Sequence, residues 1–406
     1  MSKLDELIKE LCPNGVEYKT LGEVCEIARG ASPRPIHNYL TTAENGIPWI
    51  KIGDVEVSSK YVEKTAEFVT KEGAEKSRFV KKGDFILSNS MSFGRPYILK
   101  IDGCIHDGWI FMRNYEKYFL TDFLYYLLRS NKVQHDWRQR ASSGTVSNLN
   151  SDIVKATQIP VPPLPVQKEI VRILDKFTEL TAELTAELTA ELTARRKQYE
   201  YYRDALLTRE RSETKWKELQ EIAEIGTGSC NTNEAEENGT YPFYVRSSEV
   251  LRKNTFEYDE TAIITAGDGV GVGKVFHYVE GKYALHQRAY RIHITDKTVL
   301  PRYYFHYMKA TFLNYISKEQ FKASVQSIRR PMLNKYPVPI PPFDVQERIV
   351  NVLDNFDAIC SDLKIGLPAE IDARKKQYEY YRDLLLTFAE RGNTIFTEQN
   401  RTEQNR

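Results

Sequence analysis

Cysteine is scarce in this chain, and its placement excludes two common kinds of structure. The 406 residues contain five cysteines, an odd number, scattered without any C-x-x-C pair. Neither a disulfide framework nor a zinc site is indicated, and the reducing cytoplasm is the expected compartment. No apolar run approaches the roughly 20 residues of a membrane span, and the first residues, MSKLDELIKELCPNG, are charged throughout. The sequence thus favours a protein that is neither exported nor inserted into a membrane.

Net charge and catalytic motifs are lacking as well. The formal net charge is +1, which excludes a uniformly basic surface, so any contact with nucleic acid has to be local. There is no nucleophile elbow, no H-E-x-x-H and no methyltransferase-type N-P-P-[FY] or D-P-P-Y. The glycine-rich run AGDGVGVGK, residues 266–274, has Asp268 where a phosphate-binding loop needs Gly, and Val275 follows the run where Ser or Thr is needed. We interpret this run as a tight strand turn or as backbone that approaches a DNA phosphate.

What the sequence does contain is a duplication. The segment VQKEIVRILDKF from Val166 returns as VQERIVNVLDNF from Val345, and ARRKQYEYYRD from Ala194 returns as ARKKQYEYYRD from Ala373, both 179 positions later. Proline-rich lead-ins precede the first pair and keep the same spacing. Because proline can precede a helix but cannot continue one backwards, each copy is predicted to be a helical element that starts after its prolines.

Two divergent stretches, about residues 21–158 and 219–337, accompany the helical copies. VEYKTLGEVCEIARG from Val16 is echoed by TKWKELQEIAEIGTG from Thr214, 198 positions later, so the first half is 19 residues longer. Short β-rich runs such as DFIL and TAIIT are broken by Gly, Asn and Ser. An aromatic helix candidate follows in each half, FLTDFLYYLLRS from Phe119 and LPRYYFHYMKA from Leu300. Faint common landmarks are IPWIK and YPFYV, SFGRPY and GVGKVF, and SGTVSNL and KASVQSI. The predicted fold class is α+β, with two mixed α/β heads joined by long helices.

The first helical copy carries the tetrad TAEL three times in tandem, and the second copy departs from it. The leucines recur every four residues at Leu180, Leu184, Leu188 and Leu192. This stripe drifts by roughly 40° per repeat but stays on one broad side of a helix, so it needs a packing partner. A helix over residues 166–207 would span roughly 60 Å, and each tetrad adds roughly 6 Å, which suits a spacer. The alternative is amphipathic filler made by repeat slippage. Gly366 and Pro368 predict a helix end followed by a new start in the second copy.

These features together resemble a known family. The duplicated P-P-x-x-V-Q-[KE]-[ER]-I-V and A-R-[RK]-K-Q-Y-E-Y-Y-R-D signatures, the TAEL run, and the alternation of variable heads with constant helices resemble Type I restriction-modification specificity subunits of the subgroup with TAEL repeats in the central spacer. The resemblance implies a non-catalytic DNA specificity subunit that serves defence against foreign DNA. Two target-recognition domains in pseudo-two-fold arrangement would each read half of an asymmetric bipartite site, joined by long antiparallel helices.

The resemblance also implies a division of the chain and a set of partners. The expected parts are a first target-recognition domain (1–158), a central spacer helix (159–210), a second target-recognition domain (211–337), a C-terminal helical region (338–392) and a disordered tail (393–406). The implied partners are double-stranded DNA, two modification subunits and the restriction subunits. S-adenosylmethionine, ATP and Mg belong to those subunits, so no cofactor and no metal is expected in this chain. His106 and His286, without further ligands at metal-binding spacing, are expected to be packed or hydrogen-bonded.

Basic residues beside hydroxyls and amides are the candidates for DNA contact. Arg grips phosphate or reads guanine, whereas Gln and Asn read adenine. The candidates are Asn89, Arg95, Arg138, Arg140, Ser142, Ser143 and Thr145 in the first head, and Lys274, Arg288, Lys322, Ser324, Gln326, Ser327, Arg329 and Arg330 in the second. For each residue the alternative is a solvated charged loop.

The duplicated signature also supplies candidates for docking the modification subunits. They are Gln198, Tyr199 and Tyr202, with their repeat mates Gln377, Tyr378 and Tyr381. Neighbouring tyrosines on one helix cannot all point the same way, so some rings are expected to face outward as anchors, while packing between the helices is the alternative.

Two other functions stay open at this stage. One is a self-sufficient DNA methyltransferase or nuclease with built-in recognition, which would methylate DNA without partners. The other is a coiled-coil scaffold without DNA binding, which a gel shift would expose.

Overall fold

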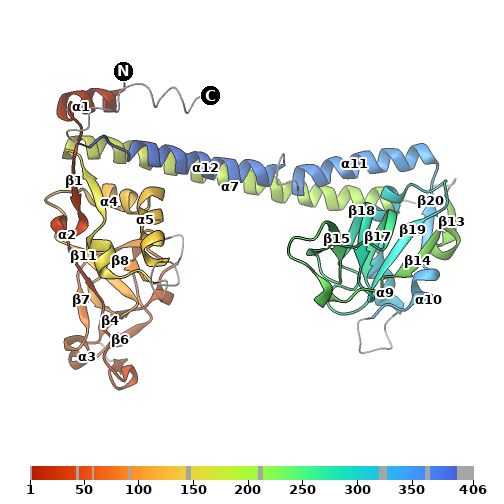
Figure 1. Cartoon of the computed structure of the whole chain (residues 1–406), viewed down its shortest axis with the longest axis horizontal. Coiled ribbons are helices and arrows are strands. Elements are labelled where there is room, and N and C mark those ends of the chain that lie inside the picture. The colour runs from red at the N-terminus through yellow and green to blue at the C-terminus, as the bar shows by residue number, and fades with distance from the viewer. Residues whose placement is uncertain are drawn as a thin grey trace. The chain divides into compact units, whose positions relative to one another are not determined.

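The structure is a computed structural model that describes residues 2–42, 45–56, 59–89, 93–142, 148–208, 214–319, 327–361 and 366–390. Backbone contacts divide the chain into two compact units, Met1–Thr185 with Asp372–Arg406, and Ala186–Ile371. Each unit holds one head and part of the helical frame (Figure 1). No helix in the described part of the chain is both long and apolar enough to cross a bilayer. The expected tail, residues 393–406, lies outside the described residues.

The first head is built on two mixed five-stranded sheets. Their strand orders are β3-β6-β4-β10-β7 and β2-β11-β8-β9-β5. The strands are β2 (Glu26–Arg29), β3 (Leu40–Thr41), β4 (Ile47–Ile50), β5 (Tyr61–Val62), β6 (Glu67–Val69), β7 (Arg78–Val80), β8 (Phe85–Ser88), β9 (Pro96–Leu99), β10 (Gly103–Ile105) and β11 (Trp109–Arg113). Neighbours run antiparallel except in the pairs β4–β10 and β5–β9. Ile50 and Ile105 from one sheet pack with Trp109 and Phe111 from the other in a buried cluster, so the two sheets share a core.

Short helices complete the first unit. They are α1 (Lys3–Leu11), α2 (Leu21–Val24), α3 (Lys71–Glu75), α4 (Thr121–Leu128), α5 (Asn131–Ser142) and α6 (Ser151–Lys155), with 3-10 turns η1 (Ile36–Asn38) and η2 (Ile52–Asp54). Helix α4 forms where the aromatic helix candidate was predicted, and its side chains from Phe123 to Leu128 are all buried. The apolar character of this segment is therefore explained by packing into the head.

The second head has one six-stranded sheet in the order β14-β19-β17-β18-β15-β16. Its strands are β14 (Ala223–Thr227), β15 (Tyr241–Tyr244), β16 (Val250–Lys253), β17 (Tyr258–Ala266), β18 (Phe276–Leu285) and β19 (Ala289–Ile294). Its helices are α8 (Leu219–Ile222), α9 (Pro301–Glu319) and α10 (Arg330–Asn334), with the 3-10 turn η3 (Thr232–Glu234). Among the described strands of this sheet, β15 and β18 form the one parallel pair. Helix α9, the second predicted aromatic helix, packs Tyr304, Met308 and Phe312 into the buried core.

The two heads follow the same plan, as the faint sequence landmarks suggested. IPWIK and YPFYV form β4 and β15, and each strand runs parallel to the one that precedes His106 or His286. In the second head β18 is a single strand, whereas the first head has β9 and β10 in separate sheets. The run AGDGVGVGK spans the turn between β17 and β18, which confirms the strand-turn interpretation.

Gly94 in the β8–β9 turn and Gly273 in the β17–β18 turn have the same role in the two heads. Gly94 and Gly273 have φ values of +68° and +70°. A Cβ atom would lie 2.8 Å from Trp137 at Gly94, and 2.7 Å from Ile316 at Gly273. Both positions therefore need glycine for the backbone conformation and for close packing of a helix on the turn.

The frame consists of two small antiparallel sheets and three long helices. The sheets pair β1 (Glu17–Thr20) with β12 (Gln158–Val161) and β13 (Lys215–Glu218) with β20 (Pro337–Ile340). The helices are α7 (Leu164–Thr208), α11 (Phe343–Ser361) and α12 (Leu367–Leu385). The predicted helix over the TAEL run and the predicted interruption near Gly366 are both confirmed, since α11 ends at Ser361 and α12 begins at Leu367.

Each frame helix inserts matching side chains into a head core. Ile170 and Leu174 of α7 are fully buried in the first unit, and their repeat mates Ile349 and Leu353 of α11 are buried in the second. Within the first unit α12 lies beside the first part of α7 (Figure 1). The long helices and the heads thus form continuous cores within each unit.

Residues 386–389, which follow α12, pack against the N-terminal part of the first unit. The amide of Val16 donates to the carbonyl of Ala389 at 2.9 Å, and the Tyr18 hydroxyl donates to the carbonyl of Phe388 at 2.9 Å. Leu386 is buried in the same core. In the second unit the corresponding link is covalent, because the chain runs on from α7 to β13.

Candidate nucleic-acid interface

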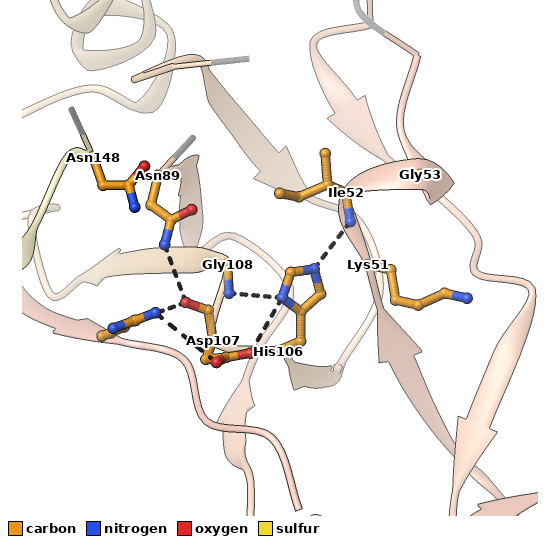
Figure 2. Close-up of a pocket in the computed structure, with 9 residues that line it drawn as sticks. Lys51, Ile52, Gly53, Asn89, His106, Asp107, Gly108 and Asn148 are labelled. Atoms are coloured by element: carbon orange, nitrogen blue, oxygen red, sulfur yellow. Dashed lines mark hydrogen bonds and ion pairs between the residues drawn. The ribbon is translucent and has the colours of Figure 1, made fainter. Parts of the chain in front are cut away.

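Two turns of the first head meet around an open cleft. Asn89, directly after β8, donates its backbone amide to the carbonyl of Gly108 at 3.0 Å and its side-chain amide to the carbonyl of Asp107 at 3.2 Å. The amide of Leu149 donates to the carbonyl of Asn89 at 2.9 Å. The cleft has a volume of about 560 Å³ and is lined by Arg29, Lys51, Ile52, Gly53, Asn89, His106, Asp107, Gly108 and Asn148 (Figure 2). Amide, basic and acidic groups therefore share one concave surface.

Asp107 organises the charge at this cleft. Its carboxylate accepts from the Ser32 hydroxyl at 2.8 Å and lies 3.3 Å from Arg34 and 3.9 Å from Arg29. The Arg29 Nε also donates to the carbonyl of Asp107 at 2.7 Å. The Ser32 hydrogen bond, helped by the Arg29 charge, lowers the pKa of the Asp107 carboxyl. The group is ionised at neutral pH and keeps both guanidinium groups at the rim of the cleft.

Histidine is part of the turn rather than of a metal site. The Nδ1 of His106 accepts from the Gly108 amide at 2.6 Å, and the Nδ1 of His286 accepts from the Arg288 amide at 3.0 Å. Burial lowers the pKa of both imidazoles, so both rings are neutral near pH 7. Across the described ranges, no three His, Cys, Asp or Glu side chains are grouped to hold a metal.

The second head repeats the backbone arrangement with different side chains. The amide of Gly267 donates to the carbonyl of Arg288 at 2.9 Å, and the amide of Ile328 donates to the carbonyl of Gly267 at 2.8 Å. These bonds match those of Asn89 with Gly108 and of Leu149 with Asn89. Here Asp268 holds the arginines, with Arg246 at 2.7 Å and Arg288 at 3.2 Å. The two heads thus share a framework that presents different polar groups.

The predicted DNA-contact residues fall into three groups. We call the residues around Asp107 in the first head and around Asp268 in the second the two turn clusters. Three predicted residues lie there: Asn89 lines the cleft, Arg288 pairs with Asp268, and Ser327 forms a β-bridge with Asp268. Arg138, Arg140 and Ser142 lie on the last turns of α5, Arg95 and Lys274 lie at the β8–β9 and β17–β18 turns, and Arg329 and Arg330 lie at the start of α10. Ser143, Thr145, Lys322, Ser324 and Gln326 lie outside the described residues.

Several of these side chains have partners within the head. Arg140 pairs with Asp136 at 2.9 Å, and Arg330 donates to the carbonyl of Ile225 at 2.7 Å. The Ser142 hydroxyl donates to the carbonyl of Gln139.

Five charged residues at the turns were not among the predicted DNA contacts: Asp107, Arg29, Arg34, Asp268 and Arg246. They are far apart in sequence. The available signals were the glycine-rich run that contains Asp268, the repeated segment that contains Arg29 and the landmark strand before Arg246.

Comparison with known proteins identifies the family. Residues 13–194 and 212–373 match the family described as the Type I restriction modification DNA specificity domain. The chain belongs to this family. The specificity subunit of the Type I restriction enzyme EcoR124I/EcoR124II of Escherichia coli is 36% identical over 261 residues, covering 58% of this chain and 63% of that subunit, less than two thirds of its length. The EcoprrI specificity subunit, also of Escherichia coli, is 26% identical over 381 residues, covering 89% of this chain and 93% of that subunit.

Solved structures show the same fold. A chain from a structure of complex assembly and conformational transition of the Type I R-M system matches with a TM-score of 0.63 and 18% identity, over 92% of this chain and 98% of that chain. The HsdS subunit from Thermoanaerobacter tengcongensis matches with a TM-score of 0.55 and 17% identity, over 93% of this chain and 96% of that chain. The predicted α+β fold of two mixed-sheet domains joined by long packed helices is confirmed. By its family the chain is a Type I restriction-modification DNA specificity subunit.

In this specificity subunit the duplicated aromatic residues make duplicated contacts. Tyr202 of α7 stacks on Phe356 of α11 with ring centroids 5.8 Å apart, and Tyr381 of α12 stacks on Phe177 of α7 at 5.9 Å. Tyr199 is 9% exposed. Their neighbours Tyr201 and Tyr380 are 70% and 49% exposed. The rings therefore divide between packing and an outward face, as the helical spacing requires.

The remaining docking and spacer candidates lie on the frame helices. The Tyr378 hydroxyl is 2.9 Å from the Thr178 hydroxyl, Gln198 accepts from Arg195, and Gln377 accepts from Arg374. Leu184, Leu188 and Leu192 are half-buried, whereas Leu180 is 46% exposed. The leucine stripe is thus only partly covered within the chain.

Proposed function

We propose that each head of this specificity subunit reads one half of a bipartite DNA site through its turn cluster. The observation that carries the proposal is the repeated backbone framework with unlike side chains, Asn89 with Asp107 in one head and Asp268 with Arg288 in the other. Arginine and asparagine are the side chains that read guanine and adenine edges. Because the heads differ, the full target is asymmetric. The other DNA-contact candidates named above belong to the same proposal.

In this proposal the two target-recognition heads are residues 1–158 and 211–337. The helical frame is residues 159–210 and 338–392, and the tail follows at 393–406. Heads that approach one face of B-DNA one helical turn apart would leave a gap of roughly six or seven base pairs between half-sites. Three TAEL units favour the longer gap. The chain would then belong to the subgroup with TAEL repeats in the central spacer. The leucines of that spacer are Leu180, Leu184, Leu188 and Leu192.

Partners would bind to the frame. Two modification subunits would dock on the duplicated Gln198, Tyr199 and Tyr202 and their repeat mates Gln377, Tyr378 and Tyr381, in support of which the neighbouring Tyr201 and Tyr380 are exposed. S-adenosylmethionine would serve those subunits, while ATP and Mg would serve restriction subunits. Such an assembly would act on double-stranded DNA in the cytoplasm.

Methylome sequencing tests the proposal. Cells that express this chain with its modification subunits are expected to carry methylation at one asymmetric motif made of two half-sites and a fixed gap. The chain expressed alone is expected to add none, which also tests the alternative of a self-sufficient methyltransferase. A continuous palindrome, or methylation by the chain alone, would contradict the proposal.

A further inference from the structure

Each turn cluster holds one carboxylate between two arginines. Asp107 lies between Arg29 and Arg34 in the first head, and Asp268 lies between Arg246 and Arg288 in the second. The two carboxylates come from different turns, since Asp107 precedes β11 and Asp268 follows β17. Descent from a single ancestral aspartate therefore does not explain why both heads have this arrangement.

A carboxylate is an unfavourable group on a surface that only has to attract DNA. It repels phosphate oxygens and offsets the charge of a neighbouring arginine. The ion pairs with the exposed arginines do not explain it either, because Arg34 and Arg288 are 82% and 61% exposed and exposed ion pairs contribute little to stability. A role in DNA recognition explains why each head keeps a carboxylate whose ion pairs weaken DNA affinity and add little to the stability of the fold.

The geometry shows what the carboxylates do to the arginines. The two Asp268 oxygens are divided between the partners, with Oδ1 accepting from Arg246 and Oδ2 from Arg288. Asp107 is itself held by the Ser32 hydroxyl and receives the Arg29 Nε on its backbone carbonyl. A planar guanidinium reads a base only when its fork is oriented, so directions fixed before DNA arrives favour base contacts over random phosphate contacts.

Both carboxylates are ionised at neutral pH. The Ser32 hydrogen bond lowers the pKa of Asp107. Partial burial acts to raise the pKa of Asp268, but the hydrogen bonds and charges of Arg246 and Arg288 outweigh it and the pKa is lowered.

We propose that Asp107 and Asp268 are positioning residues that set the sequence discrimination of the two heads. The Asp268 carboxylate would orient Arg246 and Arg288, and the Asp107 carboxylate would orient Arg34, while the backbone carbonyl of Asp107 holds Arg29. Each carboxylate would also penalise binding to non-cognate DNA, so its contribution is to specificity rather than affinity. This inference rests on the proposed function of the turn clusters.

The test measures discrimination in the complex with the modification subunits. Dissociation constants are compared, across a range of salt concentrations, for a duplex with the methylome-defined site and a duplex of equal length without it. Asp107→Asn and Asp268→Asn are expected to lower the ratio of non-cognate to cognate constants by about tenfold, mainly through tighter non-cognate binding at low salt. Methylation by each variant should tolerate base changes in one half-site only, a different one for each head.

Matched controls are available in both heads. Asp122→Asn removes a carboxylate that pairs with Lys60 at 2.6 Å, and Glu224→Gln removes one that pairs with Arg291 at 3.4 Å. Both controls are expected to keep the wild-type ratio. Equal ratios for the Asp107 and Asp268 variants and their controls would overturn the inference.

Two further results complete the test. If an asparagine variant fails to fold, Arg34→Lys and Arg288→Lys replace it in the same measurement. Lysine keeps the positive charge but lacks the planar guanidinium that the carboxylate orients. Loss of discrimination in them supports the inference, and retained discrimination overturns it. A wild-type complex without any sequence preference would instead refute the proposed function, so the two failures are distinguishable.

Discussion

Gln167 and Gln346 make the same three hydrogen bonds in the two halves of the chain. Gln167 bonds to the Leu120 amide and to the Tyr118 and Pro162 carbonyls, and Gln346 bonds to the Leu300 amide and to the Thr298 and Pro341 carbonyls. Both side chains are fully buried. The glutamine of each P-P-x-x-V-Q motif therefore ties a frame helix to its own head.

Replacing either glutamine by leucine should destabilise the unit that contains it. Leucine would leave one buried and two partly buried hydrogen bonds unmade, and we expect Gln167→Leu or Gln346→Leu to lower the free energy of unfolding by about 3 kcal/mol. Urea unfolding checks this. Gln139→Leu, at an exposed position on α5, is the control and should change stability by about 0.5 kcal/mol or less. Equal effects at the buried and exposed sites would show that these bonds contribute nothing.

Deleting one TAEL unit, residues 189–192, should shorten the gap between half-sites and spare their bases. Four helical residues rise about 6 Å, which corresponds to roughly one or two base pairs. Methylome sequencing reads the new motif directly. Glu187→Gln, which changes a TAEL side chain without changing length, should leave the motif as it was. Altered bases in either half-site would mean that the heads are not independent readers.

Truncating Tyr201 and Tyr202 should separate docking from packing. Tyr201 is 70% exposed, so Tyr201→Ala should leave the subunit's stability within about 0.5 kcal/mol while weakening its binding to the modification subunit by about tenfold. Tyr202→Ala also removes the stack on Phe356 and should lower the free energy of unfolding by about 1 kcal/mol. Calorimetric titration and urea unfolding measure the two effects. Unchanged binding by both variants would exclude this face as the docking surface.

Acidification should destabilise the second unit through His306. Its side chain is fully buried, with Nε2 2.7 Å from Asp354, and burial lowers the pKa of the imidazole although Asp354 acts to raise it. Because the folded pKa lies below the unfolded value of about 6.5, this contribution to stability is complete above that value and decreases as the pH falls below it.

His306→Gln isolates this contribution, since glutamine can still donate to Asp354 but does not titrate. Urea unfolding at about pH 7.5 and about pH 5.5 should show a smaller loss of stability for the variant than for the wild type. The variant should keep some loss, because burial lowers the pKa of His286 in the same unit. An identical loss in both proteins would assign the pH dependence elsewhere.

Much of the frame could be predicted from residue order. The duplicated V-Q and Q-Y-E-Y-Y segments, the prolines before them and the interruption near Gly366 are local signals, and α7, α11 and α12 follow them closely. IPWIK and YPFYV indicated corresponding segments of the two heads, but the strands with which they pair are known only from the structure. The partner of each ring could not be predicted, because Tyr202 of α7 meets Phe356 of α11 through the packing of two helices, which no local pattern encodes.

A duplicated frame with two unlike heads can be recognised from residue order, because repeats, helix starts and strand turns depend on residues close together in the chain. The polar groups that meet at the turns are known from the folded structure. Arg29, Asn89 and Asp107 lie up to 78 positions apart, yet they share one cleft because β2, β8 and β11 are neighbours in one sheet. Sheet order is set by long-range burial of apolar faces, and that order brings the charged residues together.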